Sequence, residues 1–73
     1  MSEPLPLVSG REVVTALQRL GYYIRKQRGS HIRLYHPNRI PVTVPAHKEL
    51  DRKTLKSILR TVNLTVEEFK NIL

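Results

Sequence analysis

The chain has 73 residues, no cysteine and a formal net charge of +7. This length allows one small domain, and the absence of cysteine excludes disulfide bonds and thiolate chemistry. A domain of this size buries only about 60% of the surface that its unfolded chain exposes, so we expect a thin core and a bound partner that adds stability.

Residues 1–8 precede the first predicted helix. They contain two prolines and lack both the basic and the apolar regions of a signal peptide. No apolar run in the sequence is long enough to span a bilayer. We therefore expect a flexible extension over residues 1–8, a single domain over residues 9–73, and a cytoplasmic protein that does not bind a membrane.

A capping-box pattern predicts the start of the first helix. The Ser9 hydroxyl can accept the Glu12 N–H, while the Glu12 carboxylate accepts the Ser9 N–H. Gly21 supplies the left-handed residue that commonly follows a helix. The residues of the apolar face are Val13, Val14, Leu17 and Leu20. The helix is therefore expected over residues 10–20.

Two strands joined by a tight turn are predicted next. Residues 22–27 have the aromatic and β-branched content of a strand, and residues 28–30 are typical of a hairpin turn. The run that follows alternates apolar and polar side chains, so one of its faces meets the core. Its other face carries His31, Arg33 and Tyr35.

A turn over residues 36–39 leads to a third strand, because Pro37 and Asn38 suit the central positions of a type I turn. Pro41 and Pro45 lack a backbone N–H, which confines this strand to an edge of the sheet or to positions whose N–H no neighbour needs. The residues expected on its inner face are Ile40, Val42 and Val44.

Helical spacing returns in the last third of the chain. Asp51 is a suitable N-cap for a second long helix. The apolar stripe of this helix consists of Leu55, Ile58, Leu59 and Val62. Thr65 and Glu68 form a second capping box, which predicts a short final helix whose Phe69 packs on the core.

The predicted fold is of the α+β class, with the order α-β-β-β-α followed by a short C-terminal helix. Short turns between the strands imply a three-stranded antiparallel sheet with the helices on one face and an open second face. The same order occurs in the double-stranded RNA-binding domain, whose second helix presents basic residues to phosphates. The residues in the comparable place here are Arg52, Lys53 and Lys56.

Positive charge is concentrated in the middle of the chain, where only Glu49 and Asp51 oppose it. Such a segment favours binding to a phosphate polymer or to an acidic protein surface. The cations of this segment are Arg25, Lys26, Arg28, Arg33, Arg39, Lys48, Arg52, Lys53, Lys56 and Arg60.

His31 follows Gly29 and Ser30 at the hairpin turn, within this cationic neighbourhood. An imidazole can give or take a proton near neutral pH. Surrounding Arg and Lys side chains can hold a polyanion against it and stabilise the extra negative charge of a phosphorane. The pattern therefore indicates proton transfer on a bound nucleic acid, with His31 as the general acid or base.

Three other residues have open interpretations. Tyr35 can stack on a base or be an ordinary surface tyrosine, and His36 is expected in a turn or at the edge of the core. His47 is either a surface residue or a contact to substrate or partner. The histidine spacings fit no recognised metal-ligand pattern, so no metal and no other cofactor is expected.

Taken together, several segments resemble the HicA family of toxins, also known as YcfA-like proteins. The segments are Leu20-Gly21, Tyr22-Tyr23, Gly29-Ser30-His31, Val42-Thr43-Val44-Pro45 with His47-Lys48, Thr54-Leu55-Lys56-Ser57-Ile58-Leu59, and Leu64-Thr65-Val66-Glu67-Glu68-Phe69. Their order and spacing cover nearly the whole chain, although residues 1–8 fall outside the usual pattern.

The resemblance implies a metal-independent endoribonuclease of a type II toxin–antitoxin system. Such a toxin cleaves mRNA and inhibits translation until a HicB-type antitoxin covers its active face. The resemblance implies that His31 is required for cleavage. The residues expected to bind RNA are Arg25, Lys26, Arg28, Ser30, Arg33, Tyr35, His47, Lys48, Arg52, Lys53 and Lys56.

Two other functions fit the charge. A non-catalytic module could hold double-stranded RNA by shape and cations, in which case loss of the His31 imidazole would matter little. A DNA-binding regulator is a poorer fit, because neither long helix has the Asn, Gln and Arg positions that base readout requires.

Overall fold

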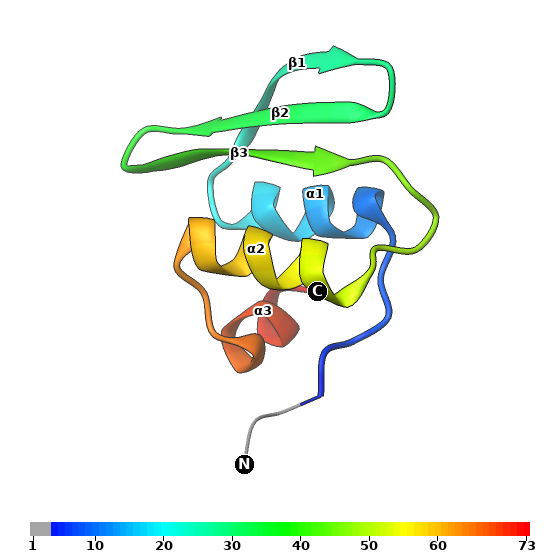
Figure 1. Cartoon of the computed structure of the whole chain (residues 1–73). Helices are drawn as coiled ribbons and strands as arrows, with labels where there is room; N and C mark the ends of the chain where they lie inside the picture. Colours follow the sequence, from blue (N-terminus) through cyan, green and yellow to red (C-terminus); the bar gives the residue numbers. More distant parts are fainter. Residues whose placement is uncertain (1–3) are drawn as a thin grey trace.

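The computed structural model describes residues 4–73, and the predicted element order is confirmed. The elements are α1 (Gly10–Arg19), β1 (Tyr23–Arg28), β2 (His31–His36), β3 (Arg39–Pro45), α2 (Arg52–Val62) and α3 (Val66–Ile72). The three strands form one layer, α1 and α2 lie against one face of it, and α3 lies beyond these helices (Figure 1). One face of the sheet is therefore left open.

Side chains of the predicted types cap all three helices. The Glu12 N–H donates to Ser9 Oγ at 3.1 Å and the Ser9 N–H to Glu12 Oε1 at 2.8 Å, which completes the first capping box. Thr65 and Glu68 form the second capping box at the start of α3. None of the helices within residues 4–73 is both long and apolar enough to cross a membrane.

The sheet is antiparallel with the strand order β1-β2-β3. β3 is an edge strand, as Pro41 and Pro45 predict. Arg28 pairs directly with His31, so the hairpin between β1 and β2 has only two turn residues. Gly29 takes a φ of 58°, which is the positive value that the first residue of such a turn often needs.

β1 contains a bulge at Arg25 that no sequence pattern predicts. Tyr23 pairs with Tyr35 and Lys26 pairs with Arg33, so Arg25 is the extra residue between them. Directly paired residues share a face of the sheet. The bulge therefore changes which residues of β1 lie on the open face, from odd-numbered before it to even-numbered after it.

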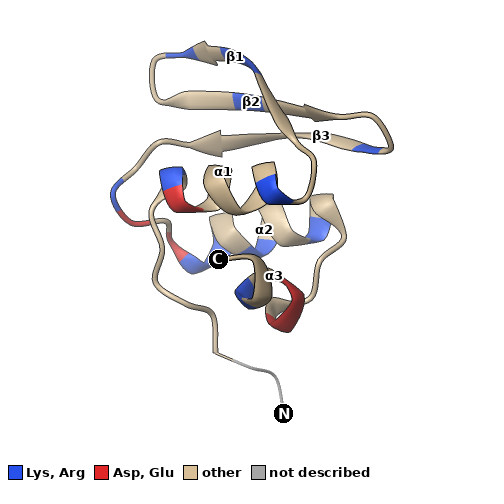
Figure 2. Cartoon of the chain, turned by 180° about the vertical axis from the view of Figure 1, so that it is seen from behind, with Lys and Arg blue, Asp and Glu red and all other residues tan. Residues whose placement is uncertain are grey.

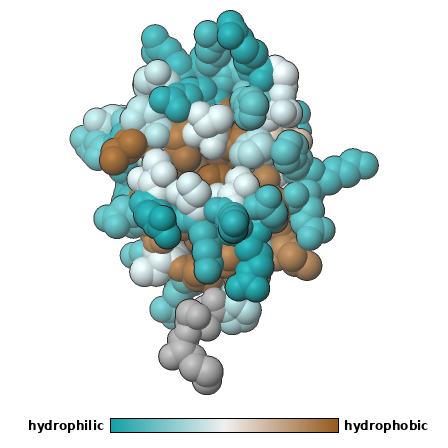
Figure 3. All heavy atoms as spheres, viewed as in Figure 1, coloured by the Kyte–Doolittle hydropathy of each residue, from teal (hydrophilic) through white to brown (hydrophobic). Residues whose placement is uncertain are grey.

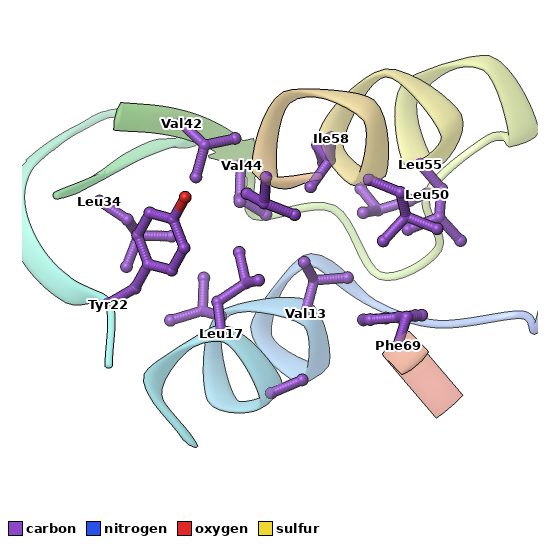
Figure 4. Packing of buried hydrophobic residues seen from close by; sticks show 14 of the residues in the cluster. Val13, Leu17, Tyr22, Leu34, Val42, Val44, Leu50, Leu55, Ile58 and Phe69 are labelled. Carbon is purple, nitrogen blue, oxygen red and sulfur yellow. The ribbon is translucent and has the colours of Figure 1, made fainter. Parts of the chain in front are cut away.

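The core lies between the helices and the inner face of the sheet. Figure 4 shows the side chains of Val42 and Val44 from β3 directed toward α1 and α2, with Phe69 of α3 at the far side. The fully buried large side chains are Phe69, Leu17, Ile32, Leu34, Leu55, Val13, Val44 and Val62. Every one of them belongs to an element that the sequence predicted.

Two predictions within the sheet were wrong. Ile40 does not face the core but is 65% exposed, because the register of β2 and β3 shifts between Leu34 and His36. Leu34 pairs with Val42 but His36 pairs with Arg39, so Ile40 lies at the irregularity and falls out of the alternation. Tyr22, which was placed in the first strand, precedes β1 and is buried at 3% exposure. Its hydroxyl donates to the Ile40 carbonyl at 2.9 Å and so links the start of β1 to β3.

The packed part of the chain begins before Ser9. Val8 is 5% exposed, and its carbonyl accepts the Leu50 N–H at 2.9 Å. Leu5 also packs against the core, partly buried. Of the extension expected over residues 1–8, residues 1–3 lie outside the described residues, and the segment ending at Val8 is part of the domain.

Candidate active site and nucleic-acid interface

The open face of the sheet is cationic. The strands carry Lys and Arg but no Asp or Glu. The nearest acidic residues in the sequence are Glu12, before the first strand, and Glu49, after the last. Figure 2 shows blue on all three strands and red only outside the sheet. Hydrophilic side chains also cover the region of β1 and β2 in the space-filling view (Figure 3). This surface suits a polyanion.

A hollow of about 410 Å³ lies on this face, and we call it the sheet hollow. Its lining residues are Arg25, Lys26, Arg28, His31, Arg33, Tyr35 and Thr43. The first six are residues that the sequence selected as candidate site residues, and none of the lining residues is acidic. The bulge at Arg25 explains why three cations of β1 reach one hollow, because Lys26 and Arg28 pair with Arg33 and His31.

Arg25, Arg33 and Tyr35 of the sheet hollow form a cluster of guanidinium and aromatic groups, and Tyr23 lies beside it. The guanidinium carbons of Arg25 and Arg33 lie 5.6 Å and 5.7 Å from the centre of the Tyr35 ring. The Tyr23 ring is tilted by 37° to the Tyr35 ring, with 6.4 Å between their centres. Arg33 is further held by a hydrogen bond of 2.8 Å from its Nη1 to Thr43 Oγ1. These contacts hold the side chains of Arg25 and Arg33 against the surface of the sheet.

His31 is the first residue of β2 and is exposed. It pairs with Arg28 on one side and with Pro45 on the other, so it lies between the two outer strands. The Ala46 N–H donates to the Ser30 carbonyl, which ties the hairpin turn to the end of β3. The imidazole is therefore presented to solvent by a turn that is fixed from two directions.

A second hollow, of about 400 Å³, opens between β3 and α2, and we call it the β3–α2 groove. It is lined by His31, Thr43, Pro45, Lys53, Thr54, Ser57 and Ile58. His31 and Thr43 line both hollows. Of the basic residues expected on the second helix, Lys53 is thus the one that the fold brings to His31.

The other candidate RNA-binding residues lie elsewhere. Arg52 lines a small hollow with residues 4–7, on a different side of α2 from the groove. Lys56 is exposed on α2 but lines neither hollow, and Lys48 is exposed in the loop before α2. His47 is exposed in the same loop, and its carbonyl accepts the Gly10 N–H at 2.9 Å.

Sequence reasoning missed three polar residues that line the hollows. Thr43 is opposite Arg33 in the strand register, which the sequence alone does not determine. Thr54 and Ser57 line the groove beside Lys53. Helical spacing from Lys53 could have suggested Ser57, four residues further along the same face.

His36 has a structural role, as its position in the alternation predicted. Its Nδ1 accepts the Asn38 N–H at 2.9 Å, so its Nε2, 3.0 Å from the Leu20 carbonyl, is the nitrogen that donates. The ring also packs edge-on against Tyr22, with 4.9 Å between ring centres. Within residues 4–73 no three His, Asp or Glu side chains form a cluster that could hold a metal ion.

The family model described as "HicA toxin of bacterial toxin-antitoxin" matches residues 10–64. The chain belongs to the HicA toxin family. The matched range of this HicA protein includes α1, the whole sheet and α2, and therefore both hollows around His31. The helix α3 lies beyond the match.

The fold of this HicA chain is similar to that of a solved chain in a toxin–antitoxin complex from Streptococcus pneumoniae. The TM-score is 0.69 and the sequence identity is 28%, over 78% of this chain and 98% of that chain. No curated protein matches the sequence. Membership of the family and the structural likeness together make this HicA chain a toxin of a toxin–antitoxin system.

Proposed function

We propose that this HicA toxin is a metal-independent endoribonuclease that cleaves mRNA in the cytoplasm, with His31 as its general acid or base. The observation that carries the proposal is the exposed His31 imidazole in a hollow lined by four cations and no carboxylate. The family and the candidate site support the same activity, because the cations that would bind the RNA surround the group that would move the proton.

The reaction is a transesterification with two proton transfers, one at the 2′-oxygen and one at the 5′-oxygen. The ribose 2′-oxygen attacks the adjacent phosphorus and loses its proton to a base, while the bond from phosphorus to the 5′-oxygen breaks and that oxygen gains a proton. The products are a 2′,3′-cyclic phosphate and a 5′-hydroxyl. His31 serves one of these transfers, and guanidinium groups beside it stabilise the additional charge on phosphorus.

We further propose that a HicB-type antitoxin covers the open face and thereby blocks His31. The related chain from Streptococcus pneumoniae was solved in a toxin–antitoxin complex, which supports an antitoxin partner. An acidic surface would complement the sheet hollow, because cations dominate its lining. Mass action then stabilises the small domain whenever the partner is bound.

The decisive experiment compares purified wild-type protein with His31→Ala on an unstructured mRNA fragment in excess EDTA. We expect cleavage by the wild type and a loss of rate of about 10²–10⁴-fold in the variant. RNA affinity should stay within a few-fold, because the cations are unchanged. Replacing the nucleotide 5′ to the cleaved bond by its 2′-deoxy form should abolish cleavage there.

Other outcomes would redirect the proposal. Intact RNA in both reactions, with RNA binding retained, would indicate a non-catalytic RNA-binding module. Equal cleavage by the wild type and His31→Ala would indicate a different catalytic residue or a contaminating nuclease.

A further inference from the structure

The two hollows around His31 lie side by side, and together we call them the path. The sheet hollow and the β3–α2 groove share His31 and Thr43 in their linings. The path therefore runs from β1, across the β2 residue His31 and the edge strand β3, to α2. A chain of nucleotides that places a phosphate at His31 must occupy both sides of it.

The β1 side of the path presents flat groups. The guanidinium groups of Arg25 and Arg33 both lie close to the Tyr35 ring, with Tyr23 beside it. Aromatic rings and guanidinium planes stack on the faces of unpaired bases. A base inside a duplex has both faces covered by its neighbours and cannot make this contact without leaving the stack. This side of the path therefore favours single-stranded RNA.

The α2 side of the path presents groups that bind phosphate. Lys53 contributes an ammonium group and Ser57 a hydroxyl to the lining of the groove. The Asp51 carboxylate caps α2 by accepting the Thr54 N–H at 2.7 Å. The positive charge of the groove therefore comes from the Lys53 side chain and not from the backbone at the start of the helix.

On the basis of the proposed ribonuclease activity, we propose that the substrate is single-stranded RNA at the cleavage site. An unpaired base stacks on Tyr35 on one side of the scissile phosphate, and Lys53 and Ser57 hold the neighbouring phosphate on the other side. The fold order alone, which is shared with a duplex-binding domain, would have favoured the opposite substrate.

Binding is best tested in the His31→Ala background, where cleavage does not interfere. The affinity of a short labelled single-stranded RNA is compared with that of the same sequence in a duplex, at equal salt. We expect the single strand to bind about ten-fold more tightly. Adding Tyr35→Ala should weaken single-strand binding about ten-fold and leave duplex binding unchanged, while Tyr35→Phe should retain it.

Lys53→Ala should weaken single-strand binding several-fold and reduce its dependence on salt. The matched control is Arg11→Ala, which also removes one positive charge but lies on α1 and lines neither hollow of the path. This control should bind as the parent does. Circular dichroism spectra of all variants establish that each one is folded.

Equal affinity for single strand and duplex, or full single-strand binding by Tyr35→Ala, would overturn this proposal. Full binding by Lys53→Ala would place the neighbouring phosphate outside the groove. These results are independent of the ribonuclease proposal, which fails only if wild-type protein leaves all RNA intact or if His31→Ala cleaves as fast as wild type.

Discussion

At the scale of single residues, Tyr22 and His36 tie the ends of the strands together. Tyr22 donates to the Ile40 carbonyl, and His36 packs against its ring while contacting the Leu20 carbonyl. Burial raises the pKa of the Tyr22 hydroxyl, although the nearby Arg39 guanidinium lowers it by a smaller amount. These two residues therefore fix the end of the sheet opposite to His31.

Tyr22→Phe removes the hydroxyl while keeping the ring. The variant should lose about 1 kcal/mol of unfolding free energy at pH 7, which is typical of one hydrogen bond. Because the folded-state pKa is raised, the contribution is complete below pH 10.0 and is lost as the pH rises through the folded-state value.

Urea denaturation of both proteins from pH 7 to pH 11 measures this difference. The advantage of the wild type should shrink above pH 10.0, the ordinary value for tyrosine. A difference that stays constant across this range would contradict the effect of burial on Tyr22. Subtracting the variant removes the contributions of lysine titration, which both proteins share.

At the scale of elements, the bulge in β1 decides the composition of the candidate site. A regular strand would place Lys26 on the opposite face from Tyr23, since side chains alternate. With Arg25 as the extra residue, Tyr23 pairs with Tyr35 and Lys26 with Arg33, so all four share the open face. An irregular backbone thus collects cations that a regular strand would divide between two faces.

The N-cap of α2 gives a pH-dependent prediction at the same scale. The backbone hydrogen bond from Thr54 is the largest of several interactions that lower the pKa of the Asp51 carboxyl. Its stabilising contribution is therefore complete above the ordinary value of 3.8 and is lost as the pH falls through the folded-state value. Asp51→Ala should lower the melting temperature at pH 7, and the difference from wild type should close in acid.

Thermal unfolding followed by circular dichroism between pH 7 and pH 2 checks this. Asp51→Asn is the matched control, because Asn also caps helices but does not titrate. Its melting temperature should stay near that of the wild type at pH 7. A loss in Asp51→Ala that persists unchanged below pH 3.8 would show that the carboxylate charge is not responsible.

At the scale of the whole molecule, the segment before α1 joins the helical layer to the loop that leads into α2. The Val8 carbonyl accepts from the Leu50 N–H, and the Gly10 N–H donates to the His47 carbonyl, both at 2.9 Å. A side chain at Gly10 would collide with the Pro45 carbonyl. The end of β3 and the start of α1 are therefore in direct backbone contact, close to the β3–α2 groove.

Two neighbouring residues test whether this segment contributes to stability. Val8 is 5% exposed and Leu7 is 77% exposed. Val8→Ala should cost about 2 kcal/mol through lost burial and the cavity that remains. Leu7→Ala should change the unfolding free energy by less than about 0.5 kcal/mol. Urea denaturation measures both, and equal losses would mean that Val8 is not part of the core in solution.

Much of this fold was predictable because its signals are local. The capping boxes at Ser9 and Thr65, the N-cap at Asp51 and the apolar periods each involve residues within a few positions of one another. The prediction for Ile40 was wrong because alternation assumes a regular strand, whereas the register of β2 and β3 shifts between Leu34 and His36. The position of Tyr22 just before β1 likewise depends on a distant acceptor, the Ile40 carbonyl.

The sequence by itself determined the element order, the edge position of β3 and the shared open face of His31, Arg33 and Tyr35, since these follow from propensity and period. Only the tertiary structure decided that Arg25, Lys26 and Arg28 line one hollow with His31, because that depends on the bulge and the strand register. It alone also selected Lys53 from the basic residues of α2, because the rotation of a helix against a sheet edge is fixed by core packing.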